Sequence, residues 1–287
     1  MSESVLSGRT VFADSETTGI SAITGRIIEI ALVEMINGKI TGRVFHELVD
    51  PEMEVDVKAE AVHKWNTESI RNELKNGVKY EKYRQVYADI KETQKFKHIA
   101  KRIKNFIGDS VVFAHNAEFD KSFFDMEYER LGEPKLSDTN KFHCTLKSAN
   151  AIRPRKRNSL DILSKIYGIN TSSLEGIKNN PKVSEEIKQV CSDYGIDPTD
   201  REEHAALKDT LILAHVAQHM FTVDNELLIK GVVHETDTMS LSEVKRTKVF
   251  EGDQLILAPA NSKDYQSHRK LMERISKTSG KTIEPGF

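Results

Sequence analysis

The segment from residue 26 to residue 49 constrains the fold of this chain more than any other part of the sequence. Two strand-like runs, residues 26–35 and 39–49, are joined by Asn37-Gly38. Asn-Gly between two such runs is the strongest short-range signal for a β-hairpin. A shorter apolar run at residues 10–13 precedes the hairpin, and Asp50-Pro51 ends the pairing. The N-terminal fifty residues therefore predict a three-stranded antiparallel unit.

The rest of the chain alternates helical patterns with one more strand. Residues 57–108 are rich in Lys and Glu, and their apolar residues at helical spacing end at Gly108, where a C-cap is expected. Residues 110–114 read as a second buried strand, which a helix follows. Asn158-Ser159 predicts an N-cap, and a last long helix covers about residues 204–221. Strands and helices in this order favour an α/β layer architecture.

Composition excludes several classes of protein. The 287 residues include 42 Lys+Arg and 44 Asp+Glu, which gives a formal net charge of −2. No apolar run approaches the roughly 18 residues that a membrane-spanning helix needs, and the N-terminus lacks the pattern of a signal peptide. Cys144 and Cys191 are too few for a disulfide framework. We therefore expect a cytoplasmic protein with no membrane partner, and composition alone names no function.

Acidic residues stand at the ends of the two buried strands and recur in the last helix. Asp14 and Glu16 are two positions apart, so on a strand both would point to the same face. Asp120 opens the helix after the second buried strand, and Asp209 follows His204 at the start of the last helix. Hard cations such as Mg²⁺ prefer carboxylate oxygens, and His suits proton transfer near neutral pH. Taken singly, each feature is better explained as a solvated turn or an ordinary first-turn acid.

Taken together, these motifs resemble one family. The ordered set D-x-E-T-T-G from Asp14, H-N-x-x-F-D ending at Asp120 and H-x-A-x-x-D from His204 resembles the DnaQ-like 3′–5′ exonucleases of the DEDDh type. The segments R-N-S-L-D at 157–161 and A-V-H at 61–63 resemble two further elements of that family. The resemblance implies a ribonuclease H-like mixed sheet, with the three antiparallel strands, additional parallel strands, flanking helices and a small C-terminal extension.

The resemblance also implies a role for each of these residues. Asp14, Glu16, Asp120 and Asp209 would hold two divalent ions, Mg²⁺ or Mn²⁺ in its place, and His204 would act as general base on a water molecule. Contacts with the substrate are expected from Thr17, Thr18, Gly19, His63, Phe119, Arg157 and Asn158. The implied reaction hydrolyses the terminal phosphodiester bond of single-stranded or frayed DNA and releases a nucleoside 5′-monophosphate.

Two features near these motifs have more than one interpretation. Trp65, the only Trp, departs from the V-H-G-I element of the family, and it could stack on a nucleobase or be a half-buried structural residue. Arg153, Arg155, Lys156 and Arg157 form the densest basic cluster. That cluster could contact phosphates or form a solvated loop. It makes nucleic-acid binding compatible with a net charge near zero.

The resemblance divides the chain into three parts. We expect an exonuclease domain at residues 1–224, with insertions at about 70–97 and 171–200, followed by a linker at 225–253 and a small element at 254–287. The last element resembles the tail that contacts the polymerase in the epsilon proofreading subunits of bacterial DNA polymerase III, although it lacks the usual terminal Trp. A polymerase subunit is therefore a candidate partner, together with DNA 3′ ends.

Among the classes within this family, the hairpin, the V-H element and the R-N-S-L-D segment are most similar to the epsilon subunits. The leading hypothesis is a DNA 3′–5′ exonuclease that proofreads or trims. One alternative is a 3′–5′ exoribonuclease of the RNase T or oligoribonuclease kind. The other is a nucleic-acid-binding scaffold subunit without activity, because fold does not imply function.

Overall fold

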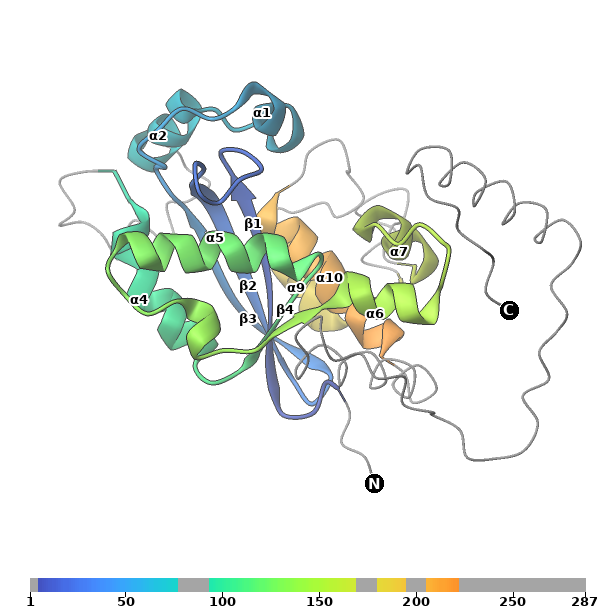
Figure 1. Cartoon of the computed structure of the whole chain (residues 1–287). Coiled ribbons are helices and arrows are strands. Elements are labelled where there is room, and N and C mark those ends of the chain that lie inside the picture. The colour runs from blue at the N-terminus through green and yellow to red at the C-terminus, as the bar shows by residue number, and fades with distance from the viewer. Residues whose placement is uncertain (1–4, 77–92, 169–179, 195–204, 222–287) are drawn as a thin grey trace, which may run out of the picture. The chain divides into compact units, whose positions relative to one another are not determined.

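The computed structural model describes residues 5–76, 93–168, 180–194 and 205–221 (Figure 1). The chain divides into two units, Met1–Thr238 and Met239–Phe287. The predicted linker at 225–253 and the predicted element at 254–287 lie outside the described residues, as do parts of both predicted insertions.

A five-stranded sheet in the order β3-β2-β1-β4-β5 lies at the centre of this unit (Figure 1). Its strands are β1 (Arg9–Thr17), β2 (Ile27–Ile36), β3 (Lys39–Leu48), β4 (Val111–Ala114) and β5 (Phe142–Cys144). The first three strands pair antiparallel in hairpin order, β4 runs parallel to β1, and β5 runs parallel to β4. The predicted antiparallel unit and the predicted mixed sheet are both confirmed.

The turn between β2 and β3 follows the Asn-Gly prediction closely. Asn37 and Gly38 have φ angles of 48° and 75°, and the ladder closes directly at the pair Ile36 and Lys39. Positive φ at both central residues is the mark of a type I′ turn, whose twist matches that of the flanking strands. The Asn37 side chain also accepts a hydrogen bond from the Gly8 amide at 2.8 Å, so the turn is tied to the start of β1.

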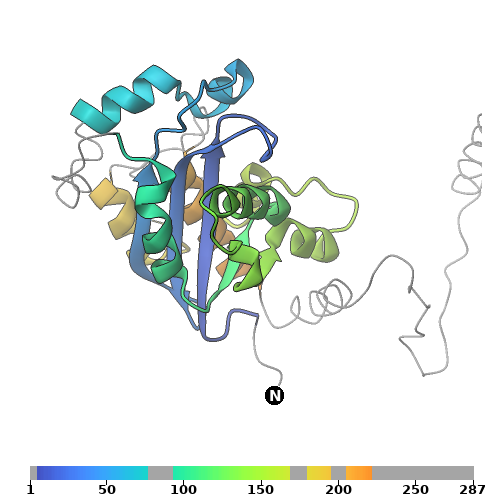
Figure 2. The same cartoon turned by 60° about the vertical axis from the view of Figure 1, so that its left-hand side comes forward.

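Helices cover both faces of the sheet (Figures 1 and 2). The elements are α1 (Val57–His63), α2 (Thr67–Asn76), α4 (Phe96–Ile107), α5 (Ala117–Arg130), η1 (Leu136–Asp138), α6 (Thr145–Ile152), α7 (Leu160–Ile166), α9 (Glu185–Tyr194) and α10 (Ala206–Met220). Alternate residues of β1 point to opposite faces: Val11 and Ala13 pack with α4 and α5, whereas Phe12 packs with α9 and α10. The predicted α/β class is therefore a three-layer arrangement with an apolar core on each side of the sheet.

Helix α10 is buried on almost every side. The sequence predicts a single apolar stripe through Leu207, Leu211, Ala214 and Phe221. All four are buried, but Ile212 and Leu213 are fully buried too. The helix packs on β1 and β2 and is covered by α7 from another side. A helix enclosed in this way carries buried residues around most of its circumference, and here they include the polar Asp209 and His215 as well as apolar side chains. Even so, no helix among the described residues is long and apolar enough to cross a membrane.

Three details differ from the sequence predictions. Strand β1 continues to Thr17, so Asp14 and Glu16 lie within the strand rather than beyond its end. Strand β5 was missed, because three residues are too few to show a periodic pattern. Ser159 is the N-cap of α7 as predicted, but its side chain makes no capping hydrogen bond.

Candidate active site

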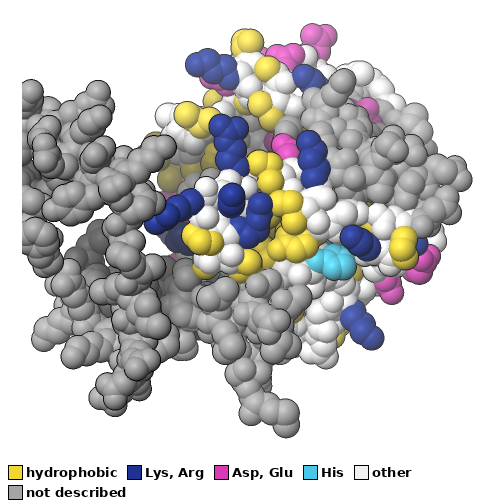
Figure 3. Space-filling model, turned by 90° about the vertical axis from the view of Figure 1, so that its right-hand side faces the viewer, with side chains coloured by type: hydrophobic (Ala, Val, Ile, Leu, Met, Phe, Trp, Pro, Cys, Tyr) yellow, Lys and Arg dark blue, Asp and Glu magenta, His cyan; other side chains and the backbone are white. Residues whose placement is uncertain are grey.

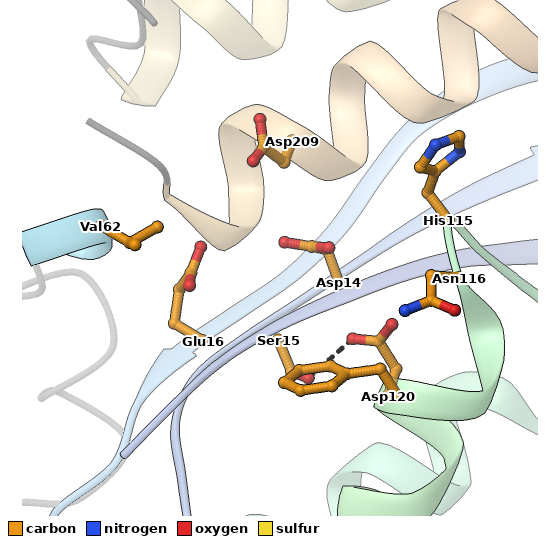
Figure 4. Close-up of a pocket in the computed structure, with 9 residues that line it drawn as sticks. Asp14, Ser15, Glu16, Val62, His115, Asn116, Asp120 and Asp209 are labelled. Carbon is orange, nitrogen blue, oxygen red and sulfur yellow. Dashed lines mark hydrogen bonds between the residues drawn. The ribbon is translucent and has the colours of Figure 1, made fainter. Parts of the chain in front are cut away.

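The predicted acids converge on a pocket at the carboxyl end of β1 (Figure 4). The pocket has a volume of about 170 Å³ and is lined by Asp14, Ser15, Glu16, Val62, His115, Asn116, Phe119, Asp120 and Asp209. Carboxylate oxygens of Asp14, Glu16 and Asp209 all lie within 4.8 Å of one another. The structure thus brings together four of the five predicted catalytic residues, and the fifth, His204, lies outside the described residues.

Successive side chains of β1 point to opposite faces of the sheet, and this alternation determines from which face each acid reaches the pocket. Asp14 and Glu16 lie on the face of the strand that packs against α10, where the first turn of the helix carries Asp209. Ser15 points to the other face, and its hydroxyl donates a hydrogen bond of 2.7 Å to the Asp120 carboxylate of α5. The regular β1–β2 ladder then breaks between Glu16 and Thr17. Acids from both faces therefore meet where the regular sheet ends.

The electrostatics of the pocket favour a bound cation. Burial raises the pKa of Asp14 well above its usual range, and the carboxylates of Asp120, Asp209 and Glu16 raise it further. Burial also raises the pKa of Asp120 to about 7, although the Ser15 hydroxyl opposes this shift. A divalent cation would relieve this repulsion, and a set made only of carboxylate oxygens suits a hard ion such as Mg²⁺. The residues present therefore fit the implied metal.

Glu29 of β2 lies on the same face of the sheet as Asp14 and Glu16 and was not among the predicted residues. It pairs with Glu16 across the ladder and is only 1% exposed. One of its oxygens lies 2.6 Å from Nε2 of His46, and the other accepts a hydrogen bond from the Ala206 amide at 3.4 Å. The first amides of a helix have no partner within it, so this contact ties the start of α10, and with it Asp209, to the sheet. The available signal was a Glu in the otherwise apolar run from Ile27 to Val33.

His115 is a second residue that the predicted set omitted. It lines the pocket, and its Nε2 lies 2.9 Å from the carbonyl oxygen of Asn158, while its Nδ1 lies 3.0 Å from the Thr145 hydroxyl. Burial lowers the pKa of His115. Because a carbonyl only accepts, Nε2 carries the proton of the neutral ring. His115 therefore fastens the loop between α6 and α7 to the pocket instead of offering a free base.

Thr17, Thr18 and Gly19 lie in and after the end of β1, as predicted. The Thr17 hydroxyl donates to the Gly19 carbonyl at 2.8 Å, and the Thr18 hydroxyl accepts from the Arg26 amide at 2.9 Å. Both hydroxyls therefore shape the loop between β1 and β2. Contact of these three residues with a substrate stays a prediction.

His63 and Trp65 lie beside this loop, with His63 at the end of α1. His63 is 2% exposed, its Nδ1 accepts from the Trp65 amide at 3.1 Å, and its Nε2 then donates to the Thr17 carbonyl at 3.2 Å. Burial lowers the pKa of His63, which favours this neutral form. Trp65 is half-buried against the apolar cluster of Ile28 and Leu48. These contacts favour the structural interpretation of Trp65, and the predicted substrate contact of His63 stays a prediction.

The remaining predicted substrate residues occupy two places. Phe119 lines the pocket, with its ring centroid 4.9 Å from that of Phe123. Asn158 is 4% exposed, and its side-chain oxygen accepts a hydrogen bond from the Arg153 guanidinium at 2.8 Å. Arg157, the residue before it, is exposed. Asn158 therefore organises its own loop, and contact of Phe119 and Arg157 with a substrate stays a prediction.

A comparison with known families decides which group of proteins shares this site. A family model described as Exonuclease matches residues 11–91 and 85–217, a range that includes all four acids. The chain belongs to the exonuclease family. The two matched stretches meet at residues 85–91, within the first predicted insertion.

Curated relatives extend the similarity over nearly the whole chain. DNA polymerase III subunit epsilon of Haemophilus influenzae is 27% identical over 284 residues, which cover 95% of this chain and 92% of that protein. The protein of the same name from Salmonella typhimurium is 27% identical over 282 residues, 96% of each chain. The predicted resemblance to epsilon subunits is confirmed.

Solved structures extend the similarity to the fold. A structure of exonuclease I matches 79% of this chain and 44% of its own, with a TM-score of 0.50 and 14% sequence identity. At this level of sequence identity the match shows similarity of fold only. Together with the observed order of the strands, it confirms the predicted ribonuclease H-like architecture.

Proposed function

We propose that this exonuclease is a cytoplasmic, metal-dependent 3′–5′ enzyme that hydrolyses the terminal phosphodiester bond of single-stranded or frayed DNA. It would release nucleoside 5′-monophosphates and act in proofreading or end trimming, as a protein like the epsilon subunit of DNA polymerase III. The observation that carries the proposal is the approach of Asp14, Glu16 and Asp209 within 4.8 Å at one pocket. Family membership and the relatives named DNA polymerase III subunit epsilon support it.

The proposal includes two divalent ions. Asp14, Glu16, Asp120 and Asp209 would hold them, because these acids combine a crowded negative charge with a donor set made only of oxygen. When bound, Mg²⁺ or Mn²⁺ polarises the phosphoryl oxygen and lowers the pKa of a water molecule. The Ser15 hydroxyl keeps the Asp120 carboxylate oriented toward the pocket.

Other residues of the chain position the reacting groups. His204 is the proposed general base, which removes a proton from the attacking water. In the sequence it directly precedes Ala205, the N-cap residue of the helix that carries Asp209, and this proximity supports the assignment. Val62 and Phe119 give the pocket an apolar wall where the terminal sugar and base can pack and where water is excluded.

One assay tests the reaction and its substrate class. The purified protein is incubated with Mg²⁺ or Mn²⁺ and with DNA and RNA oligonucleotides of matched sequence, each labelled at the 3′ or the 5′ end. We expect stepwise removal of nucleotides from the 3′ end of DNA. Absence of cleavage with either metal would contradict the exonuclease proposal and leave the scaffold alternative, whereas a preference for RNA would contradict the choice of DNA.

Two further experiments test the finer assignments. His204→Ala should abolish cleavage without loss of fold, and full activity in the folded variant would remove His204 as the base. A polymerase subunit is the proposed partner of the tail. Co-purification with the polymerase should depend on residues 254–287, and equal recovery without them would contradict that role.

A further inference from the structure

The connection between α6 and α7 concentrates positive charge. Its cations are Arg153, Arg155, Lys156 and Arg157 in the loop, with Lys147 on α6 and Lys165 on α7. All but Arg153 are exposed. From residue 147 to residue 165 the only acid is Asp161, although the whole chain has a net charge of −2. These six side chains are called the α6–α7 basic surface below.

The cations of this surface have no acidic ion-pair partner among the described residues. Within the part of the chain that the structure describes, none of the six cations forms an ion pair, whereas Arg9, Arg26 and Arg71 are all paired with carboxylates. Figure 3 faces the side where α6 and α7 lie and shows dark blue side chains gathered around an apolar centre, with the acids mainly at its margins. Clustered charges of one sign create a field that attracts a ligand of the opposite sign.

The loop that carries these cations is held in a defined shape. The side-chain amide of Asn158 donates hydrogen bonds to the side-chain oxygen of Asn150 at 2.8 Å and to the backbone carbonyl of Arg153 at 3.2 Å. The Arg153 guanidinium returns a hydrogen bond of 2.8 Å to Asn158. Arg155 has a φ of 62°, so the backbone adopts the left-handed conformation between these contacts. Because these hydrogen bonds already order the loop, less conformational entropy is lost when its cations bind a ligand.

The same loop is attached directly to the candidate active site. The backbone carbonyl of Asn158 accepts the hydrogen bond from His115, which lines the pocket beside Asp14 and Asp120. A single side chain, that of His115, therefore links the loop of the basic surface to the pocket that contains the carboxylates. Those carboxylates repel a phosphodiester, so a neighbouring surface of opposite sign offsets that repulsion for a strand that reaches the pocket.

We propose that the α6–α7 basic surface binds the phosphate backbone of the substrate strand upstream of its 3′ end, while the terminal phosphodiester occupies the pocket. The inference rests on the proposed exonuclease function. Contacts with phosphates carry no sequence information, so the surface holds any single strand of DNA and strengthens binding as the strand becomes long enough to cover it.

The test removes charge from the surface and compares two substrates. The variant Arg155→Ser/Lys156→Ser, called the Arg variant, is matched by Lys39→Ser/Lys101→Ser, called the Lys variant, which removes two exposed cations from β3 and α4. One substrate is a single-stranded DNA oligonucleotide. The other is the p-nitrophenyl ester of thymidine 5′-monophosphate, which occupies the pocket but has no upstream phosphate.

We expect the Arg variant to raise KM for DNA about tenfold near physiological salt and to leave kcat unchanged. The slope of log(kcat/KM) against log[salt] should become shallower by about 1.4, since each phosphate contact of a single strand contributes about 0.7. Hydrolysis of the ester should not change, and the Lys variant should match the wild type on both substrates.

The possible outcomes separate this inference from the proposed function. An unchanged KM and salt slope for DNA in the Arg variant, with a wild type active on both substrates, would overturn the inference and leave the exonuclease proposal intact. Equal losses on ester and DNA would overturn it as well, because the substitutions would then act on the pocket. A wild type inactive on both substrates would overturn the exonuclease proposal itself.

Discussion

The carboxylate pocket and the α6–α7 basic surface are neighbours that are built in opposite ways. The pocket collects single acids from β1, α5 and α10, which are far apart in the sequence, and Asp120 and Asp209 are almost fully buried. The basic surface is almost continuous in sequence and largely exposed. One region exists only in the folded chain, whereas the other is already present in one short stretch of sequence, residues 147–165.

The difference determines how each region responds to change. Charges that folding brings together out of water interact strongly, so they shift pKa values and need a counter-ion. Exposed charges are solvated and screened over about 8 Å at physiological salt. We therefore expect changes in the pocket to have large effects that salt does not relieve, and changes in the basic surface to have smaller effects that salt removes.

The largest effect is expected from Asp14→Ala. Loss of this acid from the cluster should lower kcat roughly 10³-fold, about 4 kcal/mol of activation free energy, because metal binding fails. Without metal, the variant should be at least as stable as the wild type, since one source of repulsion is gone. Nuclease assays and thermal unfolding measure the two effects, with the exposed Glu133→Ala as control. Wild-type kcat in a folded Asp14→Ala protein would refute the assignment of this acid.

A second effect concerns pH and metal. Because the folded-state pKa of Asp120 is raised to about 7, the native protein holds more protons than the unfolded chain between about pH 4 and pH 7. The contribution of Asp120 to stability without metal should therefore fall as pH rises through this range, by at most about 4 kcal/mol, and the raised pKa of Asp14 acts in the same direction. Added Mg²⁺ should restore it, since the ion binds the native state.

Urea unfolding across this pH range, with and without Mg²⁺, measures that dependence. Asp120→Asn should flatten the profile, whereas Asn at the exposed Asp109 should not. An identical slope in Asp120→Asn and wild type would show that Asp120 is not the titrating group.

A third and smaller effect is expected from Glu29→Ala. This change removes the contact with the Ala206 amide, so Asp209 is held less firmly in the pocket. We expect a loss of roughly 10–100-fold in metal affinity, as for other residues that orient metal ligands. Titration of activity with Mg²⁺ measures it, and Glu29→Gln, which keeps a carbonyl acceptor, should recover part of the loss. Unchanged metal affinity in Glu29→Ala would limit Glu29 to a structural role.

The smallest effect is expected from a single cation of the basic surface. Arg157→Ser should raise KM for DNA about fourfold near physiological salt, since one phosphate contact is lost. The effect should vanish at high salt, unlike that of Asp14→Ala. Steady-state assays over a range of salt concentrations measure it, and an effect that persists at high salt would place Arg157 with the pocket instead.

Sequence patterns predicted the acidic residues of the pocket, but they did not predict the neighbouring residues that support the pocket. Asp14, Glu16, Asp120 and Asp209 stand in ordered motifs, and the alternation of a strand places the first two on one face. The hairpin was equally accessible, because its Asn-Gly turn is a local signal. The hairpin and the shared face of Asp14 and Glu16 depend on residues close together in the chain, whereas the set of four acids was singled out by the resemblance of the ordered motifs to one family.

The missed residues depend on distant contacts. His115 acts through the carbonyl of Asn158, and Glu29 acts through the Ala206 amide, and neither partner has a side-chain signature in the sequence. The environment of Thr17 and His63 also depends on how the β1–β2 loop meets α1. Such contacts arise from the packing of layers, which periodicity within one segment does not encode.

The burial of α10 has a consequence for folding during synthesis. The contact between Glu29 and Ala206 joins residues 177 positions apart, so it forms only after nearly all of this unit has left the ribosome. Until then the face of β1 and β2 around Phe12 and Val33 lacks its cover. Asp209 arrives with the same helix. The growing chain therefore completes its set of four acids at the same step in which α10 closes the core. A product truncated before α10 carries only three of the four acids, and we expect it to have no nuclease activity.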